Sequence, residues 1–338
     1  MQGFNLRVQF PCLQQIILFL QHTEYRSRRL LQKAFQANAI AKPTEQAIEK
    51  PDRALLFHNA LVFLPEKQQL IRRKMALEAV HSAKSGHPGG SLSSADIMTY
   101  LYSEVMNVDP KNPKNPDRDR FVLSKGHCAP ALYGILAEKG FIPKEDIKTF
   151  RNAESYLQGH PDMKGVCGVD MSTGSLGQGI SAACGMALAG KLDGRDYRVY
   201  SILGDGEIEE GQVWEAAMFA AHYKLDNLTA FLDFNGLQID GDIRKVMNPT
   251  PIDEKFRAFN WHVISVDAHN FEELESAVSE AKATKGKPTM IIARSIKGRG
   301  VSFMENEASW HGAAPNDEQY ALAIAELNEY IKELGGNC

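Results

Sequence analysis

Residues 203–207 read LGDGE, and residues 232–237 read LDFNGL. Each stretch follows a short apolar run, 199–203 in the first case and 228–234 in the second, of the kind that forms a buried strand. An apolar, helix-length segment, 213–223, lies between them. The order strand, helix, strand predicts a parallel pair, and open α/β sheets bind ligands at the carboxyl ends of such strands. We therefore expect Asp205 and Asn235 to lie close together at that edge.

These two side chains predict a site for a metal and a phosphate. Their oxygens are the ligands that Mg²⁺ prefers, and Mg²⁺ commonly shares its coordination shell with substrate phosphates. Gly204 and Gly206 allow the backbone to approach a phosphate, and a helix amino end favours an anion. Alone, a Gly-Asp-Gly turn is more often conformational, so this prediction depends on the other motifs.

Four histidines stand next to glycine in predicted turns. The motifs are SGHPGG at 85–90, SKGH at 124–127, GHPD at 159–162 and WHG at 310–312. A fifth motif, TGSLGQG at 173–179, opens a helix of small residues that extends to residue 192. Each histidine alone is more readily a surface or capping residue, but histidines in loops at strand ends are well placed to meet a ligand. Their joint occurrence indicates a functional site.

From about residue 64 to residue 334 the chain resembles the amino-terminal half of transketolases, which use thiamine diphosphate. The Gly-Asp-Gly to Asn pattern is shared by thiamine diphosphate enzymes generally, and SGHPG and KGH narrow the resemblance to the transketolase branch. The resemblance implies thiamine diphosphate and Mg²⁺ as cofactors, and Ca²⁺ or Mn²⁺ could replace Mg²⁺. It also implies the thiamine diphosphate-binding α/β fold, a parallel sheet with helices on both faces.

The family's functional residues carry over by position. The implied metal ligands are the side chains of Asp205 and Asn235 and the main-chain carbonyl of Leu237. The residues implied to bind the cofactor are His127, Gly174, Ser175, Leu176, Gly206, Asn235 and His311. The implied catalytic histidines, which face the sugar, are His87, His160 and His311. Glu210 matches an acid at the contact between subunits.

Two positions depart from the family pattern. Ser175 stands where full-length transketolases usually carry proline, and Phe234 stands where they usually carry aspartate before the metal-binding asparagine. Neither change removes an implied ligand, and both leave the substrate subgroup open.

The length suggests a split enzyme. The chain has 338 residues, whereas a full transketolase is about twice as long and continues into a pyrimidine-binding domain that carries the cofactor-activating glutamate. No residue here matches that glutamate. The expected partner is therefore a carboxy-terminal transketolase subunit, in a higher-order oligomer, and the expected substrates are sugar phosphates. The implied reaction moves a two-carbon ketol unit from a ketose to an aldose, as in the pentose phosphate pathway.

Two other classes of function stay open at this point. One is a subunit of another thiamine diphosphate enzyme, a 2-oxo-acid dehydrogenase E1 component or a deoxyxylulose phosphate synthase. The other is a non-catalytic half that only scaffolds a partner. The dehydrogenase subunits do not usually show this set of histidines, and intact metal ligands argue against decay.

Composition excludes several partners. A net charge of −4 with 24% charged residues argues against nucleic acid. No apolar run reaches the ~20 residues of a membrane helix. The five cysteines are scattered and odd in number, which is typical of a reduced, cytoplasmic protein.

The chain divides into an extension, 1–64, and a thiamine diphosphate-binding domain, 65–338. Up to residue 44 the extension has six basic residues and one acid. An arginine-rich leader suggests a transit peptide, but we favour a mis-called start or a disordered extension.

Within the domain, further strands are expected at 121–123, 262–266 and 289–293. Helices are expected at 66–82, after the capping candidates Ser93 and Ser94, and at 144–151, 271–284 and 317–334. The glycine-containing segment 297–314 is long enough to be a functional lid.

Overall fold

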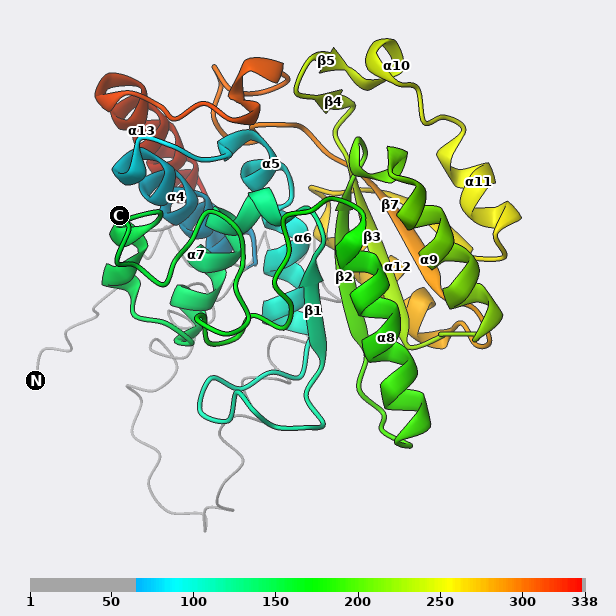
Figure 1. Ribbon diagram of the computed structural model, residues 1–338. Helices are drawn as coiled ribbons and strands as arrows, with labels where there is room; N and C mark the ends of the chain where they lie inside the picture. The colour runs from blue at the N-terminus through cyan, green and yellow to red at the C-terminus, as the bar shows by residue number, and fades with distance from the viewer. Residues whose placement is uncertain (1–64, 336–338) are drawn as a thin grey trace, which may run out of the picture. The chain divides into compact units, whose positions relative to one another are not determined.

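The computed structural model describes residues 65–335, so the prediction for the 1–64 extension lies outside the described residues. A five-stranded parallel sheet stands at the centre, with the strand order β1-β2-β3-β7-β6 (Figure 1). The strands are β1 (Arg120–Leu123), β2 (Val199–Gly204), β3 (Leu228–Phe234), β6 (His262–Asp267) and β7 (Thr289–Arg294). Each lies within one residue of its predicted bounds.

Helices cover both faces of the sheet, because alternate strand residues point to opposite sides. Phe231 packs into a core with α6 (Ala95–Tyr100), α7 (Ala129–Lys139) and α12 (Phe271–Ala283). Its neighbours Ala230 and Leu232 pack into a second core with α8 (Gln178–Leu192), α9 (Gly211–His222) and α11 (Ile252–Ala258). Figure 1 shows α8 and α9 on one side of the sheet and α12 on the other. The predicted fold class is confirmed.

A third, smaller core lies beside the sheet. It joins α4 (Pro65–Ala83), α5 (Pro88–Ser93) and α13 (Asp317–Glu333) to the buried side chains of Val301 and Met304. Through Val301 and Met304 this core holds the middle of the segment that follows β7, and through α13 it holds the helix that ends that segment. That segment contains the short 3-10 helix η5 (Ala308–His311).

Some local predictions were wrong. Ser93 lies inside α5, and Ser94 precedes α6 without capping it by its side chain. The Ser94 hydroxyl instead donates to the carbonyl of Gly90 at 2.8 Å, and the Ser93 hydroxyl donates to Asp233 at 2.6 Å. The helix expected at 144–151 is present as the 3-10 helix η3 (Lys144–Thr149).

Several short elements were not predicted. They are the π-helix η1 (Leu101–Val105), the 3-10 helix η4 (Glu207–Glu209), the hairpin strands β4 (Leu237–Gln238) and β5 (Gly241–Asp242), and α10 (Ile243–Val246), whereas the 3-10 helix η2 (Gly126–Cys128) starts the helical stretch expected from His127. Elements this short contain too few residues to show a hydrophobic period. No helix among residues 65–335 is long and apolar enough to span a bilayer.

Candidate functional site

Two parallel strand ends build the centre of the site. Gly204 on β2 pairs with Asp233 on β3, so the residues that follow leave the sheet at the same edge. Asp205 accepts the backbone N–H of Gly236 at 2.6 Å and that of Gly206 at 2.9 Å. The structure thus brings the Asp205 carboxylate against the turn that begins at Asn235.

Asp205 is buried in a way that favours a cation. Burial, and then the neighbouring Asp233 carboxylate, raise the pKa of Asp205 to about 7. The two backbone N–H groups only partly offset these effects. A nearby cation would stabilise the ionised form, which is what a metal ligand requires.

The possible metal ligands near Asp205 are oxygen atoms of different chemical groups. Among residues 65–335 no cluster of three or more His, Cys, Asp or Glu side chains could hold a metal ion. The Asp205 carboxylate, the Asn235 amide oxygen and the Leu237 carbonyl are hard oxygen atoms of the kind that Mg²⁺ accepts. With only three such oxygens, these residues would fit a metal that also binds phosphate or water.

Lys297 is a buried cation that the sequence analysis missed. Its ammonium donates to the Leu237 carbonyl at 3.1 Å and lies 3.1 Å from Nδ1 of His311. Burial lowers the pKa of Lys297, and the Asp205 carboxylate opposes that shift. Lys297 therefore links the oxygen-rich turn to the histidines. A lysine beside glycine in a loop gives no signal of burial in the sequence.

Three of the four predicted histidines form one cluster. The ring centroids of His87 and His127 are 5.2 Å apart, those of His127 and His311 5.2 Å, and those of His87 and His311 5.5 Å. They come from three separate segments: the loop before α5, η2 and η5. The structure thus brings together residues up to 224 positions apart in the chain.

The cluster is neutral near pH 7 and has unused hydrogen-bonding capacity. Burial lowers the pKa of His87 to about 4, and burial followed by the Lys297 charge lowers the pKa of His311 to about 3. The pKa of His127 is also well below its usual value, mainly through burial. Nδ1 of His87 is buried and has no hydrogen-bond partner among the described residues. An orphaned polar atom of this kind fits a ligand.

His160 takes a different place. It is exposed on the loop before α8, and its ring packs against Gly174, where an added Cβ would lie 2.9 Å from the ring. Gly174 has φ +147°, so glycine is required there on both counts. His160 therefore flanks the 174–176 turn, outside the cluster formed by the other three rings.

The 173–179 motif packs directly on the SKGH turn. A Cβ on Gly126 would lie 2.6 Å from Oγ1 of Thr173 and 2.7 Å from the Gly174 nitrogen. Ser175 is exposed and Leu176 half-buried on this turn. Glu210, exposed at the N-cap of α9, approaches the same motif, since a Cβ on Gly177 would lie 2.9 Å from its Cβ.

Glu207 is a second missed residue, and it joins three loops of the site. Its carboxylate accepts the Ser124 hydroxyl, the Gly177 N–H at 3.0 Å and the Gly204 N–H at 2.9 Å. Burial raises its pKa, and these donors oppose the rise. Glu207 thus holds the SKGH, TGSLGQG and LGDGE motifs in register.

A buried ion pair lies beneath the site. Lys125 donates to Asp233, and their side chains are 2% and 0% exposed. Asp233 also accepts from Ser93 at 2.6 Å and from Ser295. Lys125 and the Asp233 strand end are therefore fixed to each other below the histidines.

Comparison with known proteins now decides the family. Residues 66–328 match the family model described as transketolase, thiamine diphosphate binding domain. The chain belongs to the transketolase family. It is the thiamine diphosphate-binding part of a transketolase, and transketolases are transferases.

Two relatives are similar in length to the matched region. The chain is 48% identical over 264 residues to a 6-deoxy-6-sulfo-D-fructose transketolase subunit of Clostridium sp. (strain MSTE9), covering 78% of this chain and 96% of that one. It is 44% identical over 269 residues to an apulose-4-phosphate transketolase subunit of Phocaeicola vulgatus, covering 80% of this chain and 95% of that one.

Longer transketolases match over part of their length. The chain is 48% identical to human transketolase over 262 residues, which are 77% of this chain and 41% of the human protein. The structure of transketolase from Leishmania mexicana matches with a TM-score of 0.73 and 33% identity, over 80% of this chain and 45% of that one. The chain thus spans less than half of these full-length members.

Proposed function

We propose that this chain is the diphosphate- and metal-binding subunit of a two-chain transketolase, which moves a two-carbon ketol unit from a ketose phosphate to an aldose phosphate. One observation carries the proposal. Lys297 contacts both the Leu237 carbonyl and His311, so the oxygen-rich turn and the neutral histidine cluster form one site. The near-complete coverage of two relatives that are named as transketolase subunits supports the two-chain arrangement.

The metal would be Mg²⁺, which Ca²⁺ or Mn²⁺ could replace, held by Asp205, Asn235 and the Leu237 carbonyl together with the diphosphate. The buried Asp205 carboxylate supports this assignment, because it needs a cation to stay ionised. The remaining cofactor contacts in this proposal are His127, Gly206 and His311 at the diphosphate and the turn formed by Gly174, Ser175 and Leu176.

Bound thiamine diphosphate supplies the carbon nucleophile and the electron sink for carbon–carbon cleavage. The chain's own contribution would be proton movement at the substrate hydroxyl and carbonyl by His87, His160 and His311. Neutral imidazoles can both donate and accept a hydrogen bond, and an anionic diphosphate nearby favours their protonation. Loading should therefore raise the pKa of the nearest histidines from their low values toward neutrality.

The partner in this proposal is a carboxy-terminal transketolase subunit that supplies the pyrimidine-binding half, in a two-plus-two heterotetramer. Glu210 is exposed at the N-cap of α9 and is available for the contact between subunits. A cytoplasmic location and a place in the pentose phosphate pathway stay predictions. The names of the two relatives indicate 6-deoxy-6-sulfo-D-fructose and apulose-4-phosphate as substrates to test.

The test reconstitutes the full chain with a carboxy-terminal transketolase subunit. We expect the chain alone to be inactive and the mixture to transfer a two-carbon unit between sugar phosphates. Transfer by the isolated chain at the rate of a full transketolase would contradict the split arrangement. Turnover of pyruvate in place of sugars would instead assign a dehydrogenase-type subunit.

Calorimetry of thiamine diphosphate binding to the complex tests whether Asp205 is a metal ligand, because it distinguishes loss of the metal site from a general effect of removing a carboxylate. Asp205→Ala should abolish Mg²⁺-dependent binding. Asp193→Ala is the matched control, because Asp193 is 64% exposed at the end of α8. Near-normal cofactor affinity in Asp205→Ala would show that Asp205 is not a metal ligand. Absence of binding by the unaltered complex would favour a non-catalytic chain that only scaffolds its partner.

A further inference from the structure

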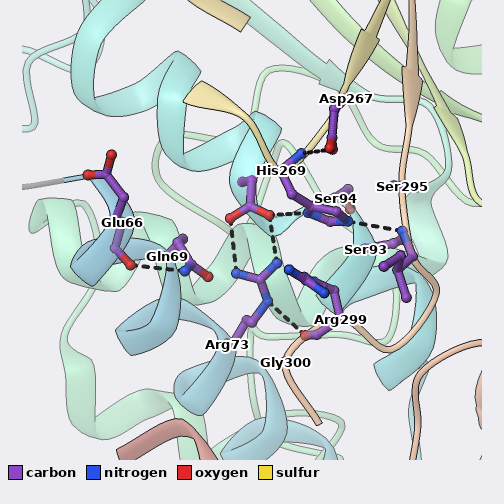
Figure 2. A network of polar contacts seen from close by, with 12 residues as sticks. Glu66, Gln69, Arg73, Ser93, Ser94, Asp267, His269, Ser295, Arg299 and Gly300 are labelled. Carbon is purple, nitrogen blue, oxygen red and sulfur yellow. Dashed lines mark hydrogen bonds and ion pairs between the residues drawn. The ribbon is translucent and has the colours of Figure 1, made fainter. Parts of the chain in front are cut away.

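A buried network of three charged or polar side chains lies beside the site, without being part of it (Figure 2). Arg73 on α4 donates to Asp96 on α6 through both terminal nitrogens, at 3.0 and 2.8 Å. His269, between β6 and α12, contacts the same carboxylate through Nδ1. The Arg73 and Asp96 side chains are 1% and 4% exposed, and His269 is 10% exposed.

The contacts define the hydrogen-bonding roles of the two ring nitrogens of His269. A carboxylate that is paired with arginine only accepts, so Nδ1 of His269 donates to Asp96. The backbone N–H of Ile296 donates to Nε2 at 3.0 Å, so this nitrogen accepts. Nδ1 of His269 is therefore the donor of this network, and Nε2 is the acceptor. Burial would raise the pKa of Asp96, but Arg73 and His269 outweigh burial and lower it, which keeps the carboxylate ionised.

Both outer ends of the network reach one backbone segment. Nε2 of His269 accepts a hydrogen bond from the Ile296 N–H, and Nε of Arg73 donates to the Arg299 carbonyl at 2.9 Å. Figure 2 shows Arg73 and His269 directed toward this segment from separate elements. Lys297 lies between the two anchored positions. Its ammonium must be held in place to reach the Leu237 carbonyl and His311.

We propose that Arg73, Asp96 and His269 are positioning residues that hold the backbone of residues 296–300, and through it Lys297, over the cofactor site. The bidentate Arg73–Asp96 pair links α4 to α6. His269 extends the pair by one hydrogen bond to the segment that carries Lys297. The effect on cofactor binding rests on the proposed function, whereas the effect on the backbone does not.

Two substitutions of His269 separate its two hydrogen bonds. Asparagine places an amide nitrogen near the position of Nδ1, so His269→Asn keeps the bond to Asp96 and leaves the Ile296 N–H without an acceptor. Glutamine places an amide oxygen near the position of Nε2, so His269→Gln restores that acceptor. His262→Asn is the matched control, because His262 lies on β6 in a partly exposed pair with Glu280.

The first readout is hydrogen exchange at the Ile296 amide of the full chain. We expect exchange at least about tenfold faster in His269→Asn, because a freed N–H opens readily, and near-normal exchange in His269→Gln and His262→Asn. Unchanged exchange in His269→Asn would overturn the anchoring of this segment, whatever the function of the protein.

The second readout is the dissociation constant of thiamine diphosphate, measured with Mg²⁺ in the reconstituted complex. We expect an increase of about tenfold in His269→Asn and recovery in His269→Gln at equal melting temperatures. Equal affinities would overturn the link to Lys297. If the unaltered complex binds no cofactor, the proposed function fails and the amide exchange alone decides whether the network anchors residues 296–300.

Discussion

The buried pair of Lys125 and Asp233 makes a strong prediction about stability. Lys125→Met removes the ammonium from a carboxylate that is fully buried. It also removes the 2.9 Å hydrogen bond from Lys125 to the Gly90 carbonyl. Ser93 and Ser295 stay on the carboxylate, but neutral donors do not replace the lost charge.

Two independent considerations give the magnitude. Removing one partner of a buried ion pair typically costs about 3–5 kcal/mol. The cost has a ceiling, because Asp233 can take up a proton instead. Protonating at pH 7 a carboxyl with an ordinary pKa of 3.8 costs about 4 kcal/mol. We therefore expect Lys125→Met to lower the free energy of unfolding by about 3–4 kcal/mol.

Urea denaturation of the full chain at pH 7 measures this loss. Lys191→Met is the matched control, because Lys191 forms a partly exposed pair with Asp226 and should cost under about 1 kcal/mol. The double variant Lys125→Met with Asp233→Asn should recover most of the loss, since an amide is uncharged, its oxygen accepts one serine hydroxyl and its nitrogen can donate to the other. A loss below about 1 kcal/mol for Lys125→Met, or a double variant as unstable as the single one, would refute the reasoning.

Three further predictions concern the site and the extension. The pKa of Asp205 is raised from 3.8 to about 7, so its contribution to the free energy of unfolding is full below pH 3.8 and is lost as the pH rises through about 7. Between these pH values, metal-free Asp205→Asn should gain up to about 4 kcal/mol in the free energy of unfolding relative to the unaltered chain. Denaturation in the presence of a chelator, at pH 4 and at pH 8, checks this prediction. An equal difference in unfolding free energy between variant and unaltered chain at both pH values would contradict it. His311→Ala and His160→Ala should lower turnover of the complex on the order of 10²-fold. A melting temperature that falls in step with activity would assign them a structural role. Deleting residues 1–64 should leave cofactor binding and assembly unchanged, and a truncated chain that fails to assemble would place the extension in the fold.

The sheet was predictable because its strands are buried on both faces. β3 reads as a mostly apolar run, interrupted only by Thr229 and Asp233, that ends at the turn containing Asn235, and burial on two sides leaves no regular polar alternation. Ser94 misled the prediction because its hydroxyl donates to a carbonyl of the preceding turn instead of capping α6. A serine in the sequence indicates where a helix can begin, but it does not show which hydrogen-bond partner the hydroxyl will have in the fold.

The candidate site was predictable only at residues whose type and position in a turn both indicate ligand binding. Asp205 and the histidine of WHG stand next to glycine in turns, where a ligand can reach them. Glu207 and Lys297 have charged side chains that the fold buries, and nothing near them in the chain indicates burial. Arg73 and His269 are 196 positions apart, so their shared carboxylate emerges only in three dimensions.

The contact between Lys297 and the Leu237 carbonyl has a consequence for how the site fills. The ammonium of Lys297 lies against an oxygen that belongs to the proposed metal site, and it also lies 3.1 Å from Nδ1 of His311. A metal held at that oxygen would therefore have a second cation beside it. The two positive charges would act together on an anion bound between the turn and the histidines.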